Sequence, residues 1–184
     1  MREALRALEL LGIVETRAGG GNFVRQLAPE DLAKPLQSFI ARGHSLREII
    51  EFRGLIEPAL AGLAADHVSQ EQLDELGEVL AEQERKVGTG QTYAEEDTVF
   101  HELVGSAAQN GLLTTMLGVI WDVLRASRDE WLQTNQRAHA SLEAHHRILD
   151  ALARHDAQAA RSAAAEHISE VGEGILKLLG GSNG

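Results

Sequence analysis

The sequence predicts an all-α protein, an antiparallel bundle of six to seven helices that is preceded by a short segment of helix and β-hairpin. Ala, Leu, Glu and Gln dominate after Arg25 and recur with helical periodicity. Residues that suit helix N-caps recur where this periodicity restarts. Short connections between such helices favour antiparallel neighbours. The chain of 184 residues is long enough to bury a core of its own.

The composition excludes several classes of protein. The chain has no cysteine, which excludes disulfides, thiol catalysis and thiolate metal ligands. No apolar run approaches the roughly 18 residues of a membrane span, and Glu3 and Glu9 are incompatible with a signal peptide. We therefore expect a cytoplasmic protein with no membrane partner. The net charge is −11, but residues 1–25 carry +1, so only this first segment suits contact with DNA phosphates.

The first 25 residues predict an amphipathic helix and two β-segments, 13–16 and 22–25, joined by a glycine-rich turn. One interpretation is a helix and a hairpin that pack on the bundle. The other is part of a winged helix-turn-helix. In that case Arg2 and Arg6, one helical turn apart, contact DNA, and the glycines bring the wing close to the phosphate backbone.

Capping patterns delimit the helices that follow. Capping boxes that begin at Ser45, Ser69 and Thr92 predict helices running to about residues 67, 88 and 110. Asn110 and Asp156 suit the N-caps of two later helices. The remaining expectations are helices ending near 125 and 179, one helix over about 136–154, a shorter helix over 32–41, and a disordered tail, 181–184.

Eight histidines in a cysteine-free chain raise the question of a metal site. Asp97 and His101 lie one helical turn apart. His145 falls at the centre of the apolar face of its helix, whereas His146 lies about 100° away. His167 lies near the edge of the apolar stripe of the last helix. Three imidazoles and one carboxylate that converge in a bundle core suit a divalent transition metal, zinc first, with nickel, cobalt and manganese as alternatives.

The competing explanation is that each inward histidine is an ordinary core residue, hydrogen-bonded to a neighbour. It is the better explanation for any one histidine, and it weakens when all four residues are taken together. The remaining histidines lie near helix ends or off the apolar faces, and we expect them in solvent: His44, His67, His139, His146 and His155.

Arg53 stands among apolar residues, with Glu57 four positions on. One interpretation is a helical ion pair between these two side chains. The other is a partly buried guanidinium that binds a ligand carboxylate through two parallel hydrogen bonds. The sequence leaves both open.

Together these motifs resemble a known family. The stretch "REALRALELLGIVETRAGGGNFVR" is similar to the end of the DNA-binding domain of GntR-family transcription regulators. The stretches "FRGLIEPALAGLAA", "DTVFHELVGSAAQN" and "HHRILDALARHDAQAARSAAAEHI" resemble the FCD effector domain of the FadR subfamily. The resemblance implies two domains: residues 1–27 form the C-terminal part of a winged helix-turn-helix, and residues 28–180 form an effector-binding and dimerisation domain. The family carries two further helices before the recognition helix. Without them, this chain is not expected to bind operator DNA on its own.

The resemblance implies a transcription repressor and not an enzyme. Its helical domain would bind a divalent metal and a small organic acid effector and form a homodimer, and the full-length protein would bind operator DNA. The implied metal ligands are Asp97, His101, His145 and His167. The implied effector contacts are Arg53 and Asn110, of which Asn110 has a capping role first. Arg2 matches a DNA-contacting arginine of the family, and its wing is matched by Gly20, Gly21 and Asn22.

Two other functions stay open at this point. The first is a metal-dependent enzyme, because three histidines and a carboxylate on a metal could activate water. Against an enzyme, no spare carboxylate or histidine is clearly placed as a general base, although Glu96 and Glu102 are close in the sequence. The second is a metal-free helical dimerisation module in which the histidines are structural.

Overall fold

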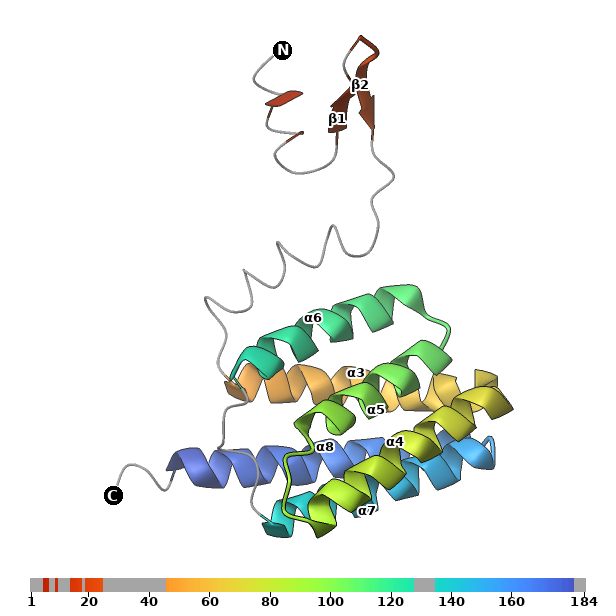
Figure 1. Cartoon of the computed structure of the whole chain (residues 1–184), viewed down its shortest axis with the longest axis vertical. Coiled ribbons are helices and arrows are strands. Elements are labelled where there is room, and N and C mark those ends of the chain that lie inside the picture. The colour runs from red at the N-terminus through yellow and green to blue at the C-terminus, as the bar shows by residue number, and fades with distance from the viewer. Residues whose placement is uncertain are drawn as a thin grey trace.

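The computed structural model describes residues 5, 6, 9, 14–17, 19–24, 46–127 and 135–180 of the chain. In this part the fold is all-α, a bundle of six helices with one antiparallel strand pair near the N-terminus (Figure 1), which confirms the predicted class. The strands are β1 (Val14–Arg17) and β2 (Gly21–Val24). The helices are α3 (Leu46–His67), α4 (Gln70–Gly88), α5 (Ala94–Ala107), α6 (Gly111–Ser127), α7 (Asn135–Ala153) and α8 (Ala157–Gly180).

The hairpin matches the two predicted β-segments to within one residue. Val14 pairs with Val24 and Arg17 with Gly21. Gly19 and Gly21 have positive φ angles of 78° and 89°, which L side chains rarely adopt, so the turn needs glycine at both positions. The Thr16 hydroxyl donates a hydrogen bond of 2.8 Å to Oδ1 of Asn22 across the strands.

Three of the predicted helix caps are confirmed. Ser69 and Gln72 form a reciprocal capping box at the start of α4, with hydrogen bonds of 3.2 and 3.1 Å. Oδ1 of Asn110 accepts a 3.2 Å hydrogen bond from the backbone of Leu113 in α6. Asp156 caps α8 in the same way. Side-chain caps of this kind contribute roughly 1 kcal/mol each to helix stability.

The predicted cap at Thr92 is wrong. Helix α5 begins at Ala94, and its N-cap is Tyr93, which makes no side-chain cap hydrogen bond. Tyr93 is buried and packs with Val87 and Ala138. The residue that precedes α5 is therefore a buried aromatic one and not the predicted hydroxyl cap.

Helix α8 packs along α3 and α7, and α4 packs against α5 and α7, so the histidine-bearing helices surround one core. The backbones of α3 and α8 approach closely, since a Cβ on Gly172 would lie 2.8 Å from the Ile50 side chain. None of the described helices combines the length and the apolar character that a membrane-spanning helix requires. Several predictions lie outside the described residues: the short helix 32–41, the cap at Ser45, and the tail, 181–184.

Candidate metal centre

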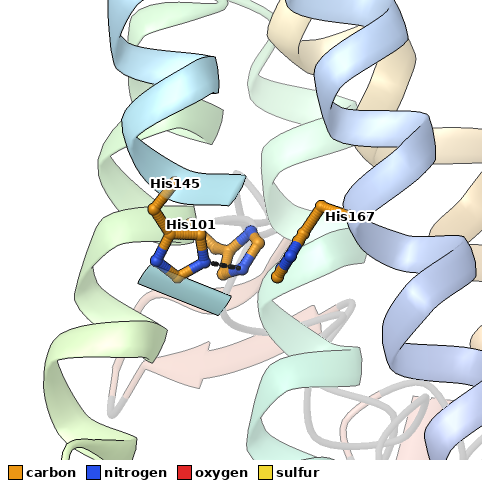
Figure 2. A group of neighbouring side chains, drawn as sticks. All are labelled: His101, His145 and His167. Atoms are coloured by element: carbon orange, nitrogen blue, oxygen red, sulfur yellow. Dashed lines mark hydrogen bonds between the residues drawn. The ribbon is translucent and has the colours of Figure 1, made fainter. Parts of the chain in front are cut away.

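Three buried histidines from three helices meet in the core of the bundle (Figure 2). His101 comes from α5, His145 from α7 and His167 from α8, and their side chains are 6%, 0% and 2% exposed. One ring nitrogen from each can be chosen so that all three lie within 4.8 Å of one another. The Nε2 atoms of His101 and His145 are 3.3 Å apart. The sequence therefore identified these inward histidines correctly, including His145 in preference to the exposed His146.

The outward nitrogens of two of these rings are held by acceptors. Nδ1 of His101 donates to Oε2 of Glu57 at 2.9 Å, and Nδ1 of His145 donates to Oε1 of Gln83, also at 2.9 Å. When Nδ1 of a neutral imidazole carries the proton, Nε2 carries a lone pair. The two Nε2 atoms that face each other are therefore both ready to act as metal ligands.

Asp97 lies at the edge of this cluster, one turn before His101 on α5. Its Oδ1 is 3.7 Å from Nε2 of His145 and accepts a 3.3 Å hydrogen bond from Ser141. The pairs Asp97–Ser141 and His101–His145 are each separated by 44 residues. Side chains of α5 and α7 therefore meet at two successive helical turns, and the two helices run in the same direction there.

Arg53 lies beside the centre and not in the cluster itself. It is buried and forms an ion pair with Glu57, which is one of the two interpretations that the sequence left open. Its guanidinium carbon lies 4.2 Å from the ring centroid of Trp121, within the range of a cation–π contact. The Trp121 ring in turn stacks on His101, with ring centroids 4.7 Å apart. Arg53 thus reaches the histidines through two side chains, Glu57 and Trp121.

A small cavity of about 10 Å³ adjoins the histidines. Its polar lining comes from Glu57, His101 and His167, and its apolar lining includes Phe100 and Leu117. Such a cavity has room for about one water-sized group. A single water or ligand oxygen could therefore lie beside the ring nitrogens.

Burial and neighbouring charges set the protonation of these groups. Burial lowers the pKa of His145 well below its ordinary value of 6.5, and the other two histidines lower it further. Burial is the main cause that lowers the pKa of His167, to about 3. Burial raises the pKa of Glu57, but Arg53 and His101 outweigh this effect and lower it to about 2. At neutral pH His145 and His167 are therefore neutral, and Glu57 is ionised.

Acid is expected to destabilise the protein when it is held in a metal chelator. Since the pKa of His167 is about 3 in the fold and 6.5 ordinarily, the unfolded chain binds more protons between these values. The free energy of unfolding should therefore fall as pH drops below 6.5, by up to about 1.4 kcal/mol per pH unit for each such group. Below 4.5 the lowered pKa of Glu57 adds a loss of the same sign. Urea unfolding at several pH values measures the slope, and a constant stability between about pH 7.5 and pH 5 would contradict it. The His146→Ala variant, which loses an exposed histidine, should keep the slope of the wild type.

The other predicted site residues lie away from the cluster. Asn110 is confirmed as the cap of α6, and its role in effector binding stays a prediction. In the N-terminal segment Arg6, Gly20, Gly21 and Asn22 are all exposed, and Arg2 lies outside the described residues. His67, His139, His146 and His155 are exposed as predicted, and His44 lies outside the described residues. Neither carboxylate considered as a general base joins the cluster: Glu96 pairs with Lys86 at 2.6 Å, and Glu102 is exposed.

Two residues of the centre were missed in the sequence. Gln83, 0% exposed, holds His145, and Trp121, 1% exposed, contacts both Arg53 and His101. Gln83 could have been found from the sequence, because it falls on the buried stripe of α4 with Leu76, Leu80 and Val87. A polar side chain in such a stripe needs a buried partner. Trp121 carried no comparable signal, since a tryptophan in an apolar helix suits any core.

Comparison with known proteins now decides the family. The FCD domain matches residues 48–170, which include every histidine of the cluster, Asp97 and Arg53. The chain belongs to the FCD-domain family. The HTH-type transcriptional regulator LutR of Bacillus subtilis is 27% identical to this FCD chain over 177 residues, which cover 93% of the chain and 81% of LutR. The Uxu operon transcriptional regulator of Escherichia coli is 27% identical over 186 residues, covering 97% of the chain and 72% of that regulator.

Solved structures agree with this assignment. A GntR protein of Streptococcus agalactiae has a TM-score of 0.62 with the FCD chain and 26% sequence identity, over 94% of this chain and 80% of that one. McbR of E. coli, 18% identical, shares the fold with a TM-score of 0.61, over 99% of this chain and 80% of that one. The chain therefore carries an FCD domain, and the relatives that it resembles over most of its length are transcriptional regulators and not enzymes, as predicted from the sequence.

Proposed function

We propose that this regulator is a metal-dependent repressor of the FadR subfamily. Its FCD domain would bind one divalent transition-metal ion, zinc first, and a small carboxylate effector, and its homodimer would bind operator DNA. The metal ligands would be His101, His145, His167 and Asp97. The observation that carries this proposal is the 3.3 Å approach of two Nε2 atoms whose Nδ1 partners are both acceptors.

The spacing of these atoms fits a metal centre. Two nitrogens that are each 2.0–2.1 Å from a tetrahedral zinc ion lie roughly 3.3–3.4 Å apart. The Nε2 atoms of His101 and His145 meet this condition without any movement. Nδ1 of His167 is buried and has no hydrogen-bond partner in the described part of the chain. His167 is therefore an incompletely paired side chain that lies beside the two Nε2 atoms.

A proton shared by His101 and His145 is the metal-free explanation of their contact. It would join only two of the rings, and it would give His167 and Asp97 no reason to lie beside them. The lowered pKa values of His145 and His167 also disfavour an added proton in this place. A divalent ion accounts for all four residues together, which favours the metal.

The effector would bind where the metal and Arg53 act on the same carboxylate. A bound metal ion supplies a Lewis acid with a free position that a carboxylate oxygen can fill. Arg53, which contacts Glu57 and Trp121, would add positive charge near the site. Asn110, which caps α6, would also contact the effector. Binding would change the shape or rigidity of the bundle and thereby the spacing of two DNA-binding segments. In these segments the operator contacts would be Arg2, Arg6, Gly20, Gly21 and Asn22.

Metal analysis tests the first step of this proposal. Protein purified without chelators is expected to contain about one divalent ion per chain, and EDTA should lower its melting temperature by several degrees, because only the folded chain binds the ion tightly. Elemental analysis and thermal unfolding, each with and without EDTA, give the two results. Protein that binds no added zinc, nickel, cobalt or manganese and melts unchanged in EDTA would exclude a metal-dependent regulator.

A further inference from the structure

Arg137 occupies the next position on the same side of α7 that carries Ser141 and His145. The three residues are spaced by four, so their side chains lie above one another, one helical turn apart. On α5 the matching positions are Tyr93, Asp97 and His101. Arg137 and Tyr93 are the corresponding residues one turn before Ser141 and Asp97, and Tyr93 acts electrostatically on Arg137. Arg137 lies about 12 Å along the helix from His145.

Arg137 is partly buried, and its guanidinium lies against helix α8. Its Nη1 atom is buried and has no hydrogen-bond partner in the described part of the chain. A Cβ on Gly174 of α8 would lie 3.3 Å from Nε and 3.4 Å from Cζ of Arg137. The guanidinium thus occupies the space that the side chain of any residue other than glycine at position 174 would fill. A glycine inside a helix is destabilising relative to alanine, so this close contact has a cost in helix stability.

A buried donor without an acceptor is unfavourable, and a guanidinium donor more so. Burial lowers the pKa of Arg137, while the charges of Tyr93 and Asp97 act in the opposite direction. Arg137 remains charged at neutral pH, since a guanidinium does not deprotonate in proteins. An anionic ligand would supply the hydrogen-bond acceptor that its Nη1 atom lacks in the described part of the chain.

The charges around the histidines indicate how many negative charges a ligand should bring. Arg53, Asp97 and Glu57 act on the histidines, and Asp97 also acts on Arg137. These four side chains supply two negative and two positive charges, so they are neutral together. A divalent metal ion would raise the sum to +2. A buried net charge is costly unless it is paired. A ligand with two negative charges would restore neutrality, whereas a monocarboxylate would leave +1.

We propose that Arg137 is a second anchor for the effector, and that the effector is a small acid with two carboxylate groups. One carboxylate would bind at the metal, and the other would accept hydrogen bonds from the Nη1 side of Arg137. This inference rests on the proposed function, because it requires the metal-bound carboxylate. It adds the chemical class of the effector and the residue that selects it.

The test compares acids that differ only in the second carboxylate. Zinc-loaded full chain is titrated in a calorimeter with succinate, glutarate and adipate, and with butyrate, valerate and hexanoate of the same lengths. We expect at least one diacid to bind about tenfold or more tightly than its matched monoacid. Arg137→Gln should weaken diacid binding about 10- to 100-fold and leave monoacid and zinc binding unchanged. Gly174→Ala, which displaces the guanidinium, should reduce the same preference by a smaller factor.

The control is Arg147→Gln, because Arg147 lies on the same helix, is 43% exposed and pairs loosely with Glu170. This variant should keep the diacid preference of the wild type. Equal binding of diacids and monoacids by the wild type, or an unchanged preference in Arg137→Gln, would overturn the role of Arg137 alone. If zinc binds and neither series of acids does, the proposed carboxylate effector fails together with this inference. If zinc itself does not bind, the proposed metal centre is wrong, and the inference about Arg137 fails with it.

Discussion

The His145→Ala variant is expected to bind zinc at least about 100-fold more weakly than the wild type, since loss of a ligand should exceed the 10- to 100-fold effect of losing an outer partner. His145 is 0% exposed, and its Nε2 atom is the one that approaches both His101 and Asp97. Its removal leaves two imidazoles and a carboxylate, and a small side chain cannot replace the lost nitrogen. Competition with a chromophoric chelator measures the two affinities.

The adjacent residue supplies a matched control. His146 is exposed and is not part of the cluster, and His146→Ala removes the same chemical group from the same helix. It should bind zinc as the wild type does. Equal zinc affinity in the wild type, His145→Ala and His146→Ala would show that the buried histidines hold no metal.

Stability measurements separate a metal ligand from a packing residue. In EDTA, His145→Ala should cost about 2–3 kcal/mol of unfolding free energy, because it leaves a cavity in a fully buried place. In zinc the wild type gains binding free energy that the variant lacks, so the difference between them should grow. Urea unfolding in zinc and in EDTA gives both values. The same difference in both buffers would indicate a purely structural histidine.

The sequence predicted those features of the fold that depend on residues close together in the chain. The capping box of Ser69 and Gln72 and the caps at Asn110 and Asp156 act within one helical turn, and all three are present. The choice of His145 over His146 needed only the apolar face of one helix. The predicted cap at the start of α5 was wrong: the N-cap is Tyr93, whose ring packs against residues of α4 and α7.

The connections within the centre could not be predicted, since they join residues far apart in the sequence. Gln83 and His145 are 62 residues apart, and no periodicity of either helix pairs them. Glu57 could be matched with Arg53 four residues away, yet its second contact, with His101, depends on how α3 packs against α5. The sequence therefore identified the residues of the centre better than the contacts that control their protons.

The Glu57→Ala variant is expected to lose about 3–5 kcal/mol of unfolding free energy, because it leaves the buried guanidinium of Arg53 without its partner. Glu57 is 5% exposed and ion-pairs with Arg53 inside the bundle. Its removal also frees Nδ1 of His101, so that the ring can turn or change tautomer. Zinc affinity should therefore fall about 10- to 100-fold as well. Urea unfolding and chelator competition measure the two effects.

A matched control comes from the same helix. Glu51 also pairs with an arginine four residues away, Arg47, at 3.0 Å, but both side chains are more than 60% exposed. Exposed pairs of this kind contribute about 0–1 kcal/mol. Glu51→Ala should therefore change stability little and leave zinc affinity unchanged. If Glu51→Ala lost as much unfolding free energy as Glu57→Ala, the effect would come from helix propensity and not from the buried ion pair.

A double variant separates the two roles of Glu57. Replacing Arg53 and Glu57 together by leucine removes both buried charges, and such replacements often restore stability. It restores no acceptor for Nδ1 of His101, so zinc affinity should stay about 10- to 100-fold below that of the wild type. In Glu57→Gln an amide oxygen can still accept from His101, so zinc binding should survive better than in Glu57→Ala. Recovery of full zinc affinity in the double leucine variant would mean that Glu57 serves the ion pair alone and does not orient the metal ligand.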